Sequence, residues 1–131
     1  MSLDLSKKVV TVRPDQAITT KQNLPYYVGI STETAGAVGL SINLVVIPPG
    51  GSPQAHFHKD FETAIYLLKG RVETKFGEDL KESVINVEGD FVYIPPGVPH
   101  KPVNLSDSEP ALAIVSRNDP NEHENVMPYD R

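Results

Sequence analysis

The most informative stretch of the sequence is GDFVYIPPGVPHKPVN, which runs from Gly89 to Asn104. It opens with a strand-like apolar run that a Pro-Pro-Gly turn interrupts. His100 follows three residues after Gly97, just beyond this turn. Taken alone, a histidine in this place is more typical of a loop than of a metal site. Its meaning therefore depends on a second segment.

That second segment is GGSPQAHFHKDFETAIYLLKG, from Gly50 to Gly70. His56 and His58 stand two residues apart, so in a strand both imidazoles project from the same face. An isolated pair of this kind is weak evidence, but Glu62 follows four residues after the second histidine. A carboxylate beside two imidazoles suits divalent manganese, iron, nickel or zinc.

Together the two segments resemble the metal-binding motifs of the cupin family. The first family motif, G-x5-H-x-H-x(3,4)-E-x6-G, fits from Gly50 to Glu62, and its last glycine, Gly70, arrives one residue late. The second, G-x5-P-x-G-x2-H-x3-N, fits fully from Gly89 to Asn104. At residue frequencies of about 5–7%, its five fixed positions coincide by chance about once in 10⁶ starts. The second motif is therefore a strong signal.

The resemblance implies an all-β jelly-roll barrel (a double-stranded β-helix) with one divalent metal near its mouth. It implies that His56, His58 and Glu62 ligate this metal from one strand and that His100 ligates it from a strand facing them. Cupins of this type commonly pair as homodimers, so a homodimer is expected. The resemblance also implies a small-molecule ligand or substrate.

The rest of the chain is consistent with this fold class. Proline (12) and glycine (9) recur at short intervals, and short β-branched or aromatic runs lie between them, which is typical of a sandwich or barrel. We predict one domain over residues 1–131, with an extension at about 1–8 and a polar tail at about 118–131. The predicted strands are Val9–Val12, Tyr26–Ser31, Leu40–Ile47, Ala64–Leu68, Arg71–Phe76, Glu82–Val87, Phe91–Ile94 and Ala111–Ser116.

Composition argues against several classes of protein. The chain has no cysteine, which excludes disulfides and thiolate metal sites. Its net charge is −5 without a basic cluster, which argues against a nucleic-acid partner. No apolar run approaches the roughly 18 residues of a membrane helix, and no signal-peptide pattern is present. A cytoplasmic location without membrane attachment is expected.

The carboxylate is where the sequence departs from the family pattern. Counting forward from His58 the expected ligand is Glu62, but counting back from Gly70 the position falls on Thr63. Neighbouring strand residues face opposite sides, so only one of these two can point at the metal. We predict that Glu62 and, by parity, Tyr66 point inward, because a carboxylate strongly stabilises a metal bound by neutral imidazoles. The alternative is a three-histidine site, which resembles the cysteine-dioxygenase branch of the family.

Five further polar residues bear on the site. Gln54 and Tyr66 are candidate catalytic residues if they face the cavity. The alternative for Gln54 is a polar side chain that faces solvent, and the alternative for Tyr66 is an aromatic residue of the core. Asn104 is predicted to hold the chain after the ligand strand. Arg117 suits an anionic substrate group, but a surface salt bridge is the simpler reading. His123 is predicted to be a solvated tail residue.

These observations favour a metal-dependent enzyme that acts on a small polar or carboxylate metabolite. A metal with open positions polarises a bound oxygen or activates dioxygen. Dioxygenase, decarboxylase, isomerase and lyase chemistry all remain open. The alternative is a non-catalytic cupin that binds a small molecule or metal, because a fold does not decide function.

Overall fold

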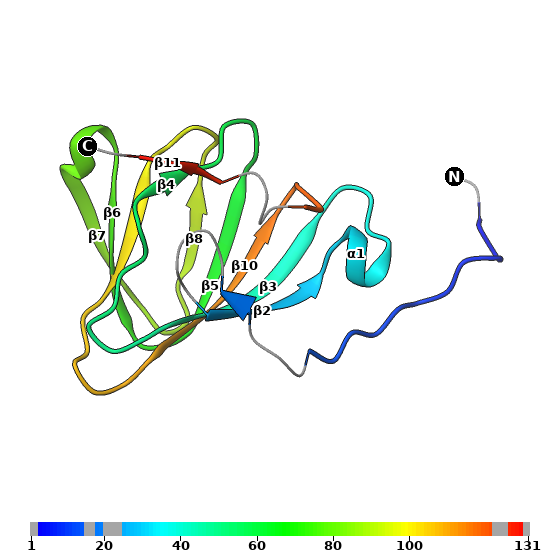
Figure 1. The fold of residues 1–131 in the computed structure, drawn as a ribbon, viewed down its shortest axis with the longest axis horizontal. Helices are drawn as coiled ribbons and strands as arrows, with labels where there is room; N and C mark the ends of the chain where they lie inside the picture. The colour runs from blue at the N-terminus through cyan, green and yellow to red at the C-terminus, as the bar shows by residue number, and fades with distance from the viewer. Residues whose placement is uncertain (1–2, 15–17, 20–24, 122–125, 130–131) are drawn as a thin grey trace.

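The computed structural model of the protein describes residues 3–14, 18–19, 25–121 and 126–129. Two antiparallel sheets enclose the interior (Figure 1), which confirms the predicted all-β fold. In spatial order, the first sheet consists of β1 (Ile18–Thr19), β2 (Pro25–Ile30), β3 (Ser41–Ile47), β10 (Ala111–Arg117), β5 (Thr63–Lys69) and β8 (Phe91–Ile94). The second consists of β11 (Met127–Pro128), β4 (His56–Phe57), β9 (His100–Asn104), β6 (Arg71–Phe76) and β7 (Glu82–Val87).

Helix is confined to two short segments in the described part of the chain. The first, α1 (Thr32–Ala35), is capped by the side chain of Ser31 and ends at Gly36, whose φ is 73°. The second is a 3₁₀ turn, η1 (Glu78–Leu80). Among the described residues no helix is long and apolar enough to cross a membrane.

Most strands predicted from the sequence are present, with ends that differ by one residue at most. The exception is the segment Val9–Val12, which forms no strand. Val9 and Val10 are 96% and 50% exposed, and the chain around them extends away from the sheets (Figure 1). A β-branched run favours a strand only where a partner strand completes its hydrogen bonds.

The β-branched and aromatic runs did not locate strand β9, because Pro102 lies in its middle, and a strand at His100 was expected from the family resemblance alone. Proline cannot donate a hydrogen bond, so it is usually excluded from central strands. Here β4 pairs with β9 only at His56 and His100. Pro102 therefore faces no paired residue of β4, so its missing N–H breaks no hydrogen bond to that strand. On the other side of β9, Pro102 is paired in register with Thr74 of β6.

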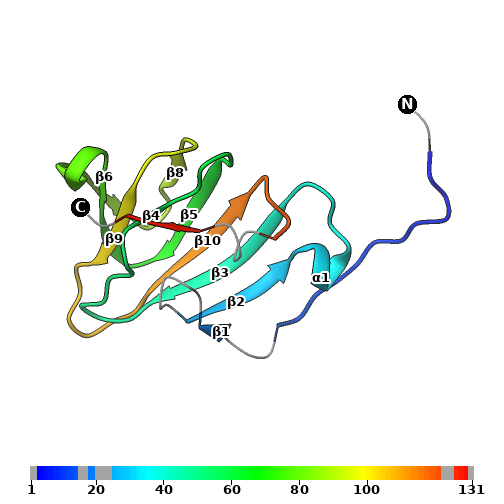
Figure 2. The same cartoon turned by 45° about the horizontal axis from the view of Figure 1, so that its top comes forward.

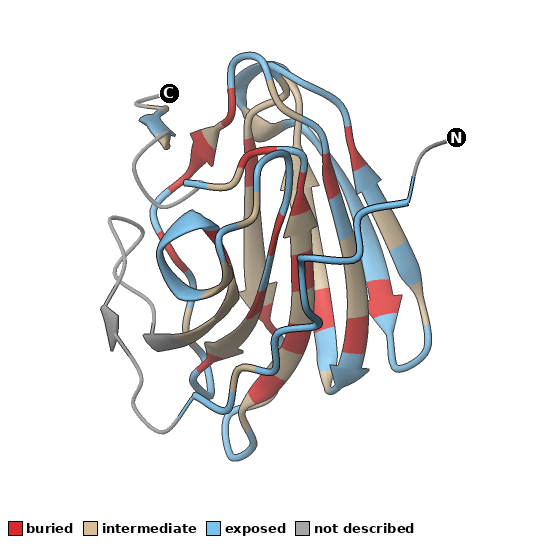
Figure 3. Ribbon diagram, turned by 90° about the vertical axis from the view of Figure 1, so that its right-hand side faces the viewer, coloured by how far each residue is buried: buried red, intermediate tan, exposed pale blue. Residues whose placement is uncertain are grey.

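The interior lies between the two sheets, and every second residue of β10 belongs to it. Ala111, Ala113, Val115 and Arg117 are buried, whereas the residues between them are partly exposed. Figure 3 shows buried positions interrupted by more exposed ones along several strands. This alternation is expected for a strand with one covered face. The rest of the buried apolar cluster comes from both sheets and consists of Ile47, Leu67 and Val72.

Gly70 closes the turn between β5 and β6, as its place in the motif predicted. Its φ is 105°, and a Cβ atom there would lie 2.9 Å from the Cβ of Ala111. Both the backbone conformation and the close approach of β10 therefore require glycine at this position.

Candidate metal centre

Three of the four histidines meet in the interior. Strands β4 and β9 are antiparallel neighbours with His56 opposite His100 (Figure 2). The ring centroids are 4.3 Å apart for His56 and His100, 5.2 Å for His56 and His58, and 5.9 Å for His58 and His100. One ring nitrogen from each lies within 4.8 Å of the others. The predicted convergence is confirmed, although the histidine strands are neighbours in one sheet rather than facing strands.

The hydrogen bonds of two imidazoles prepare them for metal binding. Nδ1 of His56 lies 3.1 Å from the carbonyl oxygen of Gln54, and Nδ1 of His100 lies 2.9 Å from that of Val98. A carbonyl oxygen only accepts hydrogen bonds, so each Nδ1 must carry the proton and donate. Nε2 of each ring then keeps its lone pair, which is the form that a metal ion requires.

Burial keeps the same two rings neutral. His56, His58 and His100 are 4%, 3% and 4% exposed. Burial, followed by the charge of His100 and that of Arg117, lowers the pKa of His56 from 6.5 to about 3. Burial, and the charge of Arg117, lowers the pKa of His100 to about 4, although its bond to Val98 opposes this shift. Neutral imidazoles suit divalent transition metals, so this donor set fits the metal that the sequence motifs imply.

The loop that carries His100 is tied directly to the other histidine segment. The amide of Gly97 donates to the carbonyl oxygen of His58 over 2.8 Å. Gly97 has a φ of 78°, which explains why the motif requires glycine here. The turn therefore holds His100 beside His58 with main-chain geometry.

Asn104 fixes the far end of β9, as predicted. It is 2% exposed, and its Nδ2 atom donates to the carbonyl oxygens of Ile47, Pro48 and Glu109 at 2.9–3.2 Å. Its Oδ1 atom accepts from the amide of Ser106 over 3.0 Å. Its role is to hold three chain segments together behind the histidine strand.

Glu62 lies on the outer face, so the predicted register was wrong. Its side chain is exposed, and its Oε1 atom accepts a hydrogen bond from the hydroxyl of Tyr93 over 2.8 Å. Thr63 is the buried neighbour, at 1% exposed. Among the described residues, the group that can hold a metal consists of the three histidines without Glu62. The structure thus has the three-histidine arrangement that the sequence left as the alternative.

The error arose because the chain changes sheet between His58 and Glu62. Strand β4 belongs to the second sheet and β5, which starts at Thr63, belongs to the first. Side-chain parity holds only within one continuous strand, so counting from His58 to Glu62 across this crossing was invalid. Strand β5 does contain an irregularity, but at its other end: its pairing with β10 shifts register between Leu112 and Ala113.

The two candidate catalytic residues do not face the histidines. Tyr66 shares the outward parity of Glu62, and its ring packs 4.8 Å from that of Phe91, which is 85% exposed. Gln54 is exposed and contributes its backbone carbonyl to His56 instead of its side chain. His123 lies outside the described residues.

We expect Glu62→Gln to leave metal binding unchanged within a few-fold, because this carboxylate does not reach the histidines. Isothermal titration with a divalent metal measures this directly. The same substitution should lower the pKa of Tyr93, which the hydrogen bond to Glu62 raises, and NMR titration of that ring measures it. A large loss of metal affinity in this variant would show that Glu62 is a metal ligand after all.

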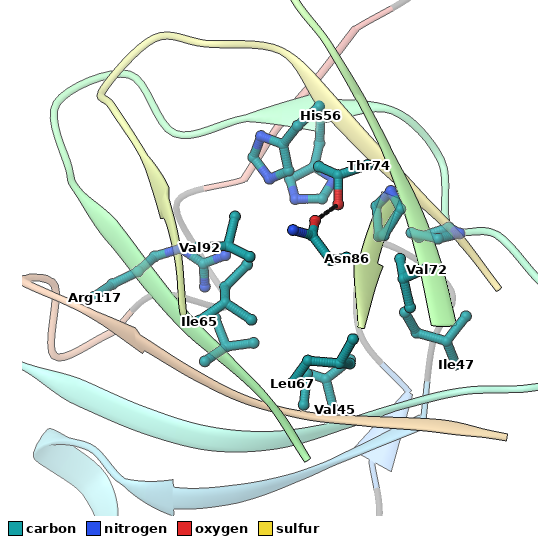
Figure 4. A pocket seen from close by; sticks show the side chains of 15 residues that line it. Val45, Ile47, His56, Ile65, Leu67, Val72, Thr74, Asn86, Val92 and Arg117 are labelled. Carbon is teal, nitrogen blue, oxygen red and sulfur yellow. Dashed lines mark hydrogen bonds between the residues drawn. The ribbon is translucent and has the colours of Figure 1, made fainter. Parts of the chain in front are cut away.

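A cavity of about 80 Å³ is lined in part by His56 and His100. Figure 4 shows this cavity with His56 at its edge. Aliphatic side chains form most of its wall, including Val45, Ile65, Leu67, Val92 and Val115. Two polar features interrupt this wall. One is the pair Thr74 and Asn86, in which the Thr74 hydroxyl donates to Asn86 Oδ1 over 2.8 Å, and the other is Arg117.

Arg117 lines the cavity, although the sequence favoured a surface salt bridge over a substrate-binding position. It is 7% exposed, which contradicts the surface salt bridge that the sequence favoured. The sequence signal that could have placed Arg117 inside is its even spacing along the strand from Ala111, Ala113 and Val115. Because the residues between these three are also mostly apolar, the sequence did not show which row faces inward.

Comparison with known proteins supports the fold and the family. Residues 43–116 match the family model described as Cupin domain, and no curated protein matches the sequence. The structure resembles a Cupin 2 conserved barrel domain protein from Salinispora arenicola at 26% identity, covering 86% of this chain and 91% of that one, with a TM-score of 0.70.

Two enzymes share the fold at lower identity. The polyketide cyclase RemF from Streptomyces resistomycificus is 24% identical over 95% of this chain and 86% of that one, with a TM-score of 0.71. The oxalate decarboxylase of Lactobacillus farciminis is 22% identical over 80% of this chain and 31% of that one, with a TM-score of 0.69. Because the family model spans more than half of the sequence, the chain belongs to the cupin family.

Proposed function

We propose that the protein is a metal-dependent enzyme that acts on a small polar or carboxylate metabolite beside a divalent ion held by His56, His58 and His100. The observation that carries this proposal is the buried cluster of three imidazoles, two of which are held with Nε2 available for a metal. Such an ion, when bound with open positions, acts as a Lewis acid or activates a bound oxygen species.

The donor set narrows the choice of metal. With Glu62 outside, the protein offers three imidazole nitrogens and no carboxylate among the described residues. Imidazole suits zinc, iron and nickel, whereas manganese prefers oxygen ligands. Of the four metals considered from the sequence, manganese is therefore the least favoured.

The chain's own residues prepare the site in three ways. The carbonyls of Gln54 and Val98 hold two imidazoles in the metal-binding tautomer. The aliphatic wall limits the access of water and strengthens polar interactions inside the cavity. The pair Thr74 and Asn86 adds a hydrogen-bonding position on the wall.

The alternative is a non-catalytic cupin that binds a small molecule, and one observation favours it. No Asp or Glu belongs to the described lining of the cavity, and Tyr66 and Gln54 point elsewhere. The described part of the site therefore offers no carboxylate as the general acid or base that many reactions use. Decarboxylase and cyclase activities are those of the two structural neighbours named above, and they support the enzyme reading as analogy.

Purified protein prepared without chelator is expected to carry about one divalent transition metal per chain, because the described residues form one cluster of three buried histidines. Elemental analysis by mass spectrometry measures the amount and the identity. The absence of metal, together with no uptake on titration with zinc, iron or nickel, would contradict the proposed function.

Turnover separates the enzyme from the binding protein. The metal-loaded chain is screened against small carboxylates by thermal shift, and each compound that raises the melting temperature is then incubated and analysed for products. Consumption of a bound compound supports the enzyme, whereas stable binding without products supports the alternative.

A further inference from the structure

Asn86 is a buried polar residue on a strand that is otherwise exposed. Strand β7 lies at the edge of the second sheet, and its other residues are exposed, whereas Asn86 is 9% exposed. The side chain of Asn86 lines the cavity together with that of Thr74 on β6, and Figure 4 shows the two joined at the edge of the open space. A polar group in a mostly aliphatic wall is unfavourable unless its hydrogen bonds are made. The hydrogen bonds of this pair therefore decide which ligand the wall accepts.

The orientation of the Asn86 amide follows from its neighbours. Its Nδ2 atom lies 3.5 Å from Oδ2 of Asp90, and a carboxylate oxygen only accepts, so this side of the amide is the donor. The same Oδ2 atom is held by the main-chain amide of Val87, which donates to it over 2.9 Å. Oδ1 of Asn86 then accepts from the Thr74 hydroxyl over 2.8 Å. The orientation of the amide and the direction of the Thr74 proton are both fixed in this way.

The pair leaves one donor and one acceptor available to a ligand. Because the Thr74 hydroxyl gives its proton to Asn86, it can only accept a further hydrogen bond, and no donor among the described residues reaches it. One Nδ2 hydrogen of Asn86 is directed to Asp90, and the other has no acceptor in the described part of the chain. A hydroxyl group both donates and accepts, so one hydroxyl satisfies both positions. A carboxylate only accepts and would be repelled by Asp90.

Strand register places this pair one step from the metal centre. On β6, Thr74 is opposite Pro102 of β9, and Phe76 is opposite His100. Thr74 is therefore a diagonal neighbour of His100, and such neighbours are about 7–8 Å apart on one face of an antiparallel pair. Both residues line the cavity. A ligand that contacts the pair and the metal centre therefore carries its two polar groups a few carbon atoms apart.

The walls and the volume of the cavity limit the part of the ligand between these two groups. Ile65, Leu67 and Val115 belong to the aliphatic lining, which favours contact with hydrocarbon over contact with water. A volume of about 80 Å³ admits a short chain only. At the other end, a divalent ion held by the histidines would attract an anionic oxygen.

We propose that Thr74 and Asn86 bind the hydroxyl group of a short aliphatic hydroxy acid, whose carboxylate lies at the histidine end of the cavity. The hydroxyl donates to Thr74 Oγ1 and accepts from Asn86 Nδ2, and the hydrocarbon between the two groups lies against the aliphatic wall. This inference deepens the proposed function by naming its ligand class, and it rests on that function for the carboxylate end alone. Asp90 is a positioning residue, because it acts through the Asn86 amide.

β-Hydroxypropionate is the probe, and butyrate is its comparison, because butyrate has a methyl group in place of the hydroxyl and is otherwise of the same length. Titration calorimetry is performed on the full, zinc-loaded chain. The test variant is the double substitution Thr74→Val and Asn86→Leu, which replaces both partners with apolar groups of similar shape and leaves neither of them unpaired. Ser83→Val is the matched control, because Ser83 is an exposed polar residue of β7.

We expect β-hydroxypropionate to bind the natural chain and Ser83→Val at least about tenfold more tightly than butyrate does, because butyrate leaves the buried donor and acceptor unpaired. In the double variant this preference should disappear or reverse, since the wall is then apolar. A purely structural role of the pair would change stability but not the ratio of the two affinities. Equal or tighter binding of butyrate to the natural chain, an unchanged ratio in the double variant, or no binding of β-hydroxypropionate would each overturn the inference.

Three outcomes separate the hydroxyl site from the metal. If the double variant does not fold, the ratio of the two affinities on the natural chain decides. If zinc binds normally and the natural chain shows no preference, the hydroxyl site fails alone. If the chain takes up no zinc, n-propanol and n-propyl chloride replace the two acids in an NMR titration of the Asn86 side-chain amide. A shift caused by n-propanol alone then means that the metal function fails while hydroxyl binding stands, and equal shifts or no shift overturn both.

Discussion

Replacing His100 with alanine is expected to lower the affinity for a divalent metal by more than about 100-fold. Loss of a residue that only hydrogen-bonds a metal ligand typically lowers metal affinity by about 10–100-fold, and loss of a ligand itself should cost more. The reason is that His100 supplies one of the three imidazole nitrogens that could hold the metal. Zinc titration against a competing chelator measures the affinity. The zinc-induced rise in melting temperature should shrink in parallel, because bound metal stabilises the folded state by mass action.

His123→Ala is the control for this experiment, since the sequence predicts that His123 is a solvated tail residue. It should bind metal like the natural chain. Equal losses in both variants would mean that the tail contributes to the site. Unchanged affinity in His100→Ala would mean that the metal binds elsewhere or not at all.

The metal-free protein is expected to lose stability steeply as the pH falls from 7 towards 5. In the unfolded chain the histidine pKa is about 6.5, whereas in the folded chain it is about 3 for His56 and about 4 for His100. Between these pKa values the unfolded state binds more protons than the folded state. The stability that the two histidines contribute is therefore fully present above the unfolded pKa and is lost as the pH falls below that value. At pH 5 the two histidines together lower the free energy of unfolding by about 4 kcal/mol.

Urea denaturation of chelated protein at several pH values measures this free energy of unfolding. His100→Gln should reduce the slope between pH 7 and pH 5 by about half, because one of the two titrating groups is removed. Carboxylates titrate mostly below this window, since their reference pKa values are about 4. A flat stability profile from pH 7 to pH 5 would show that the imidazoles are not buried as neutral groups.

The sequence was informative wherever the determining signal is local. The β-branched runs between glycine and proline turns located seven strands to within one residue, because such runs form strands whenever a partner is present. The two-residue spacing of His56 and His58 pointed to a shared site, and both belong to the histidine cluster although β4 itself ends at Phe57. His100 joins them because its turn requires Gly97 and brings that glycine's amide to His58.

The tertiary structure alone decided the direction of Glu62 and the place of Arg117. Glu62 faces outward because the chain leaves one sheet after His58 and enters the other at Thr63, and strand parity carries no information across such a crossing. Arg117 lies inside because β10 is covered by the opposite sheet on the side of Ala113 and not on the other. The sequence by itself determined the fold class and, through local spacing, the three histidines that could hold a metal. The sheets' packing decided which neighbouring side chains share their cavity, because burial is a property of the assembled layers and not of one strand.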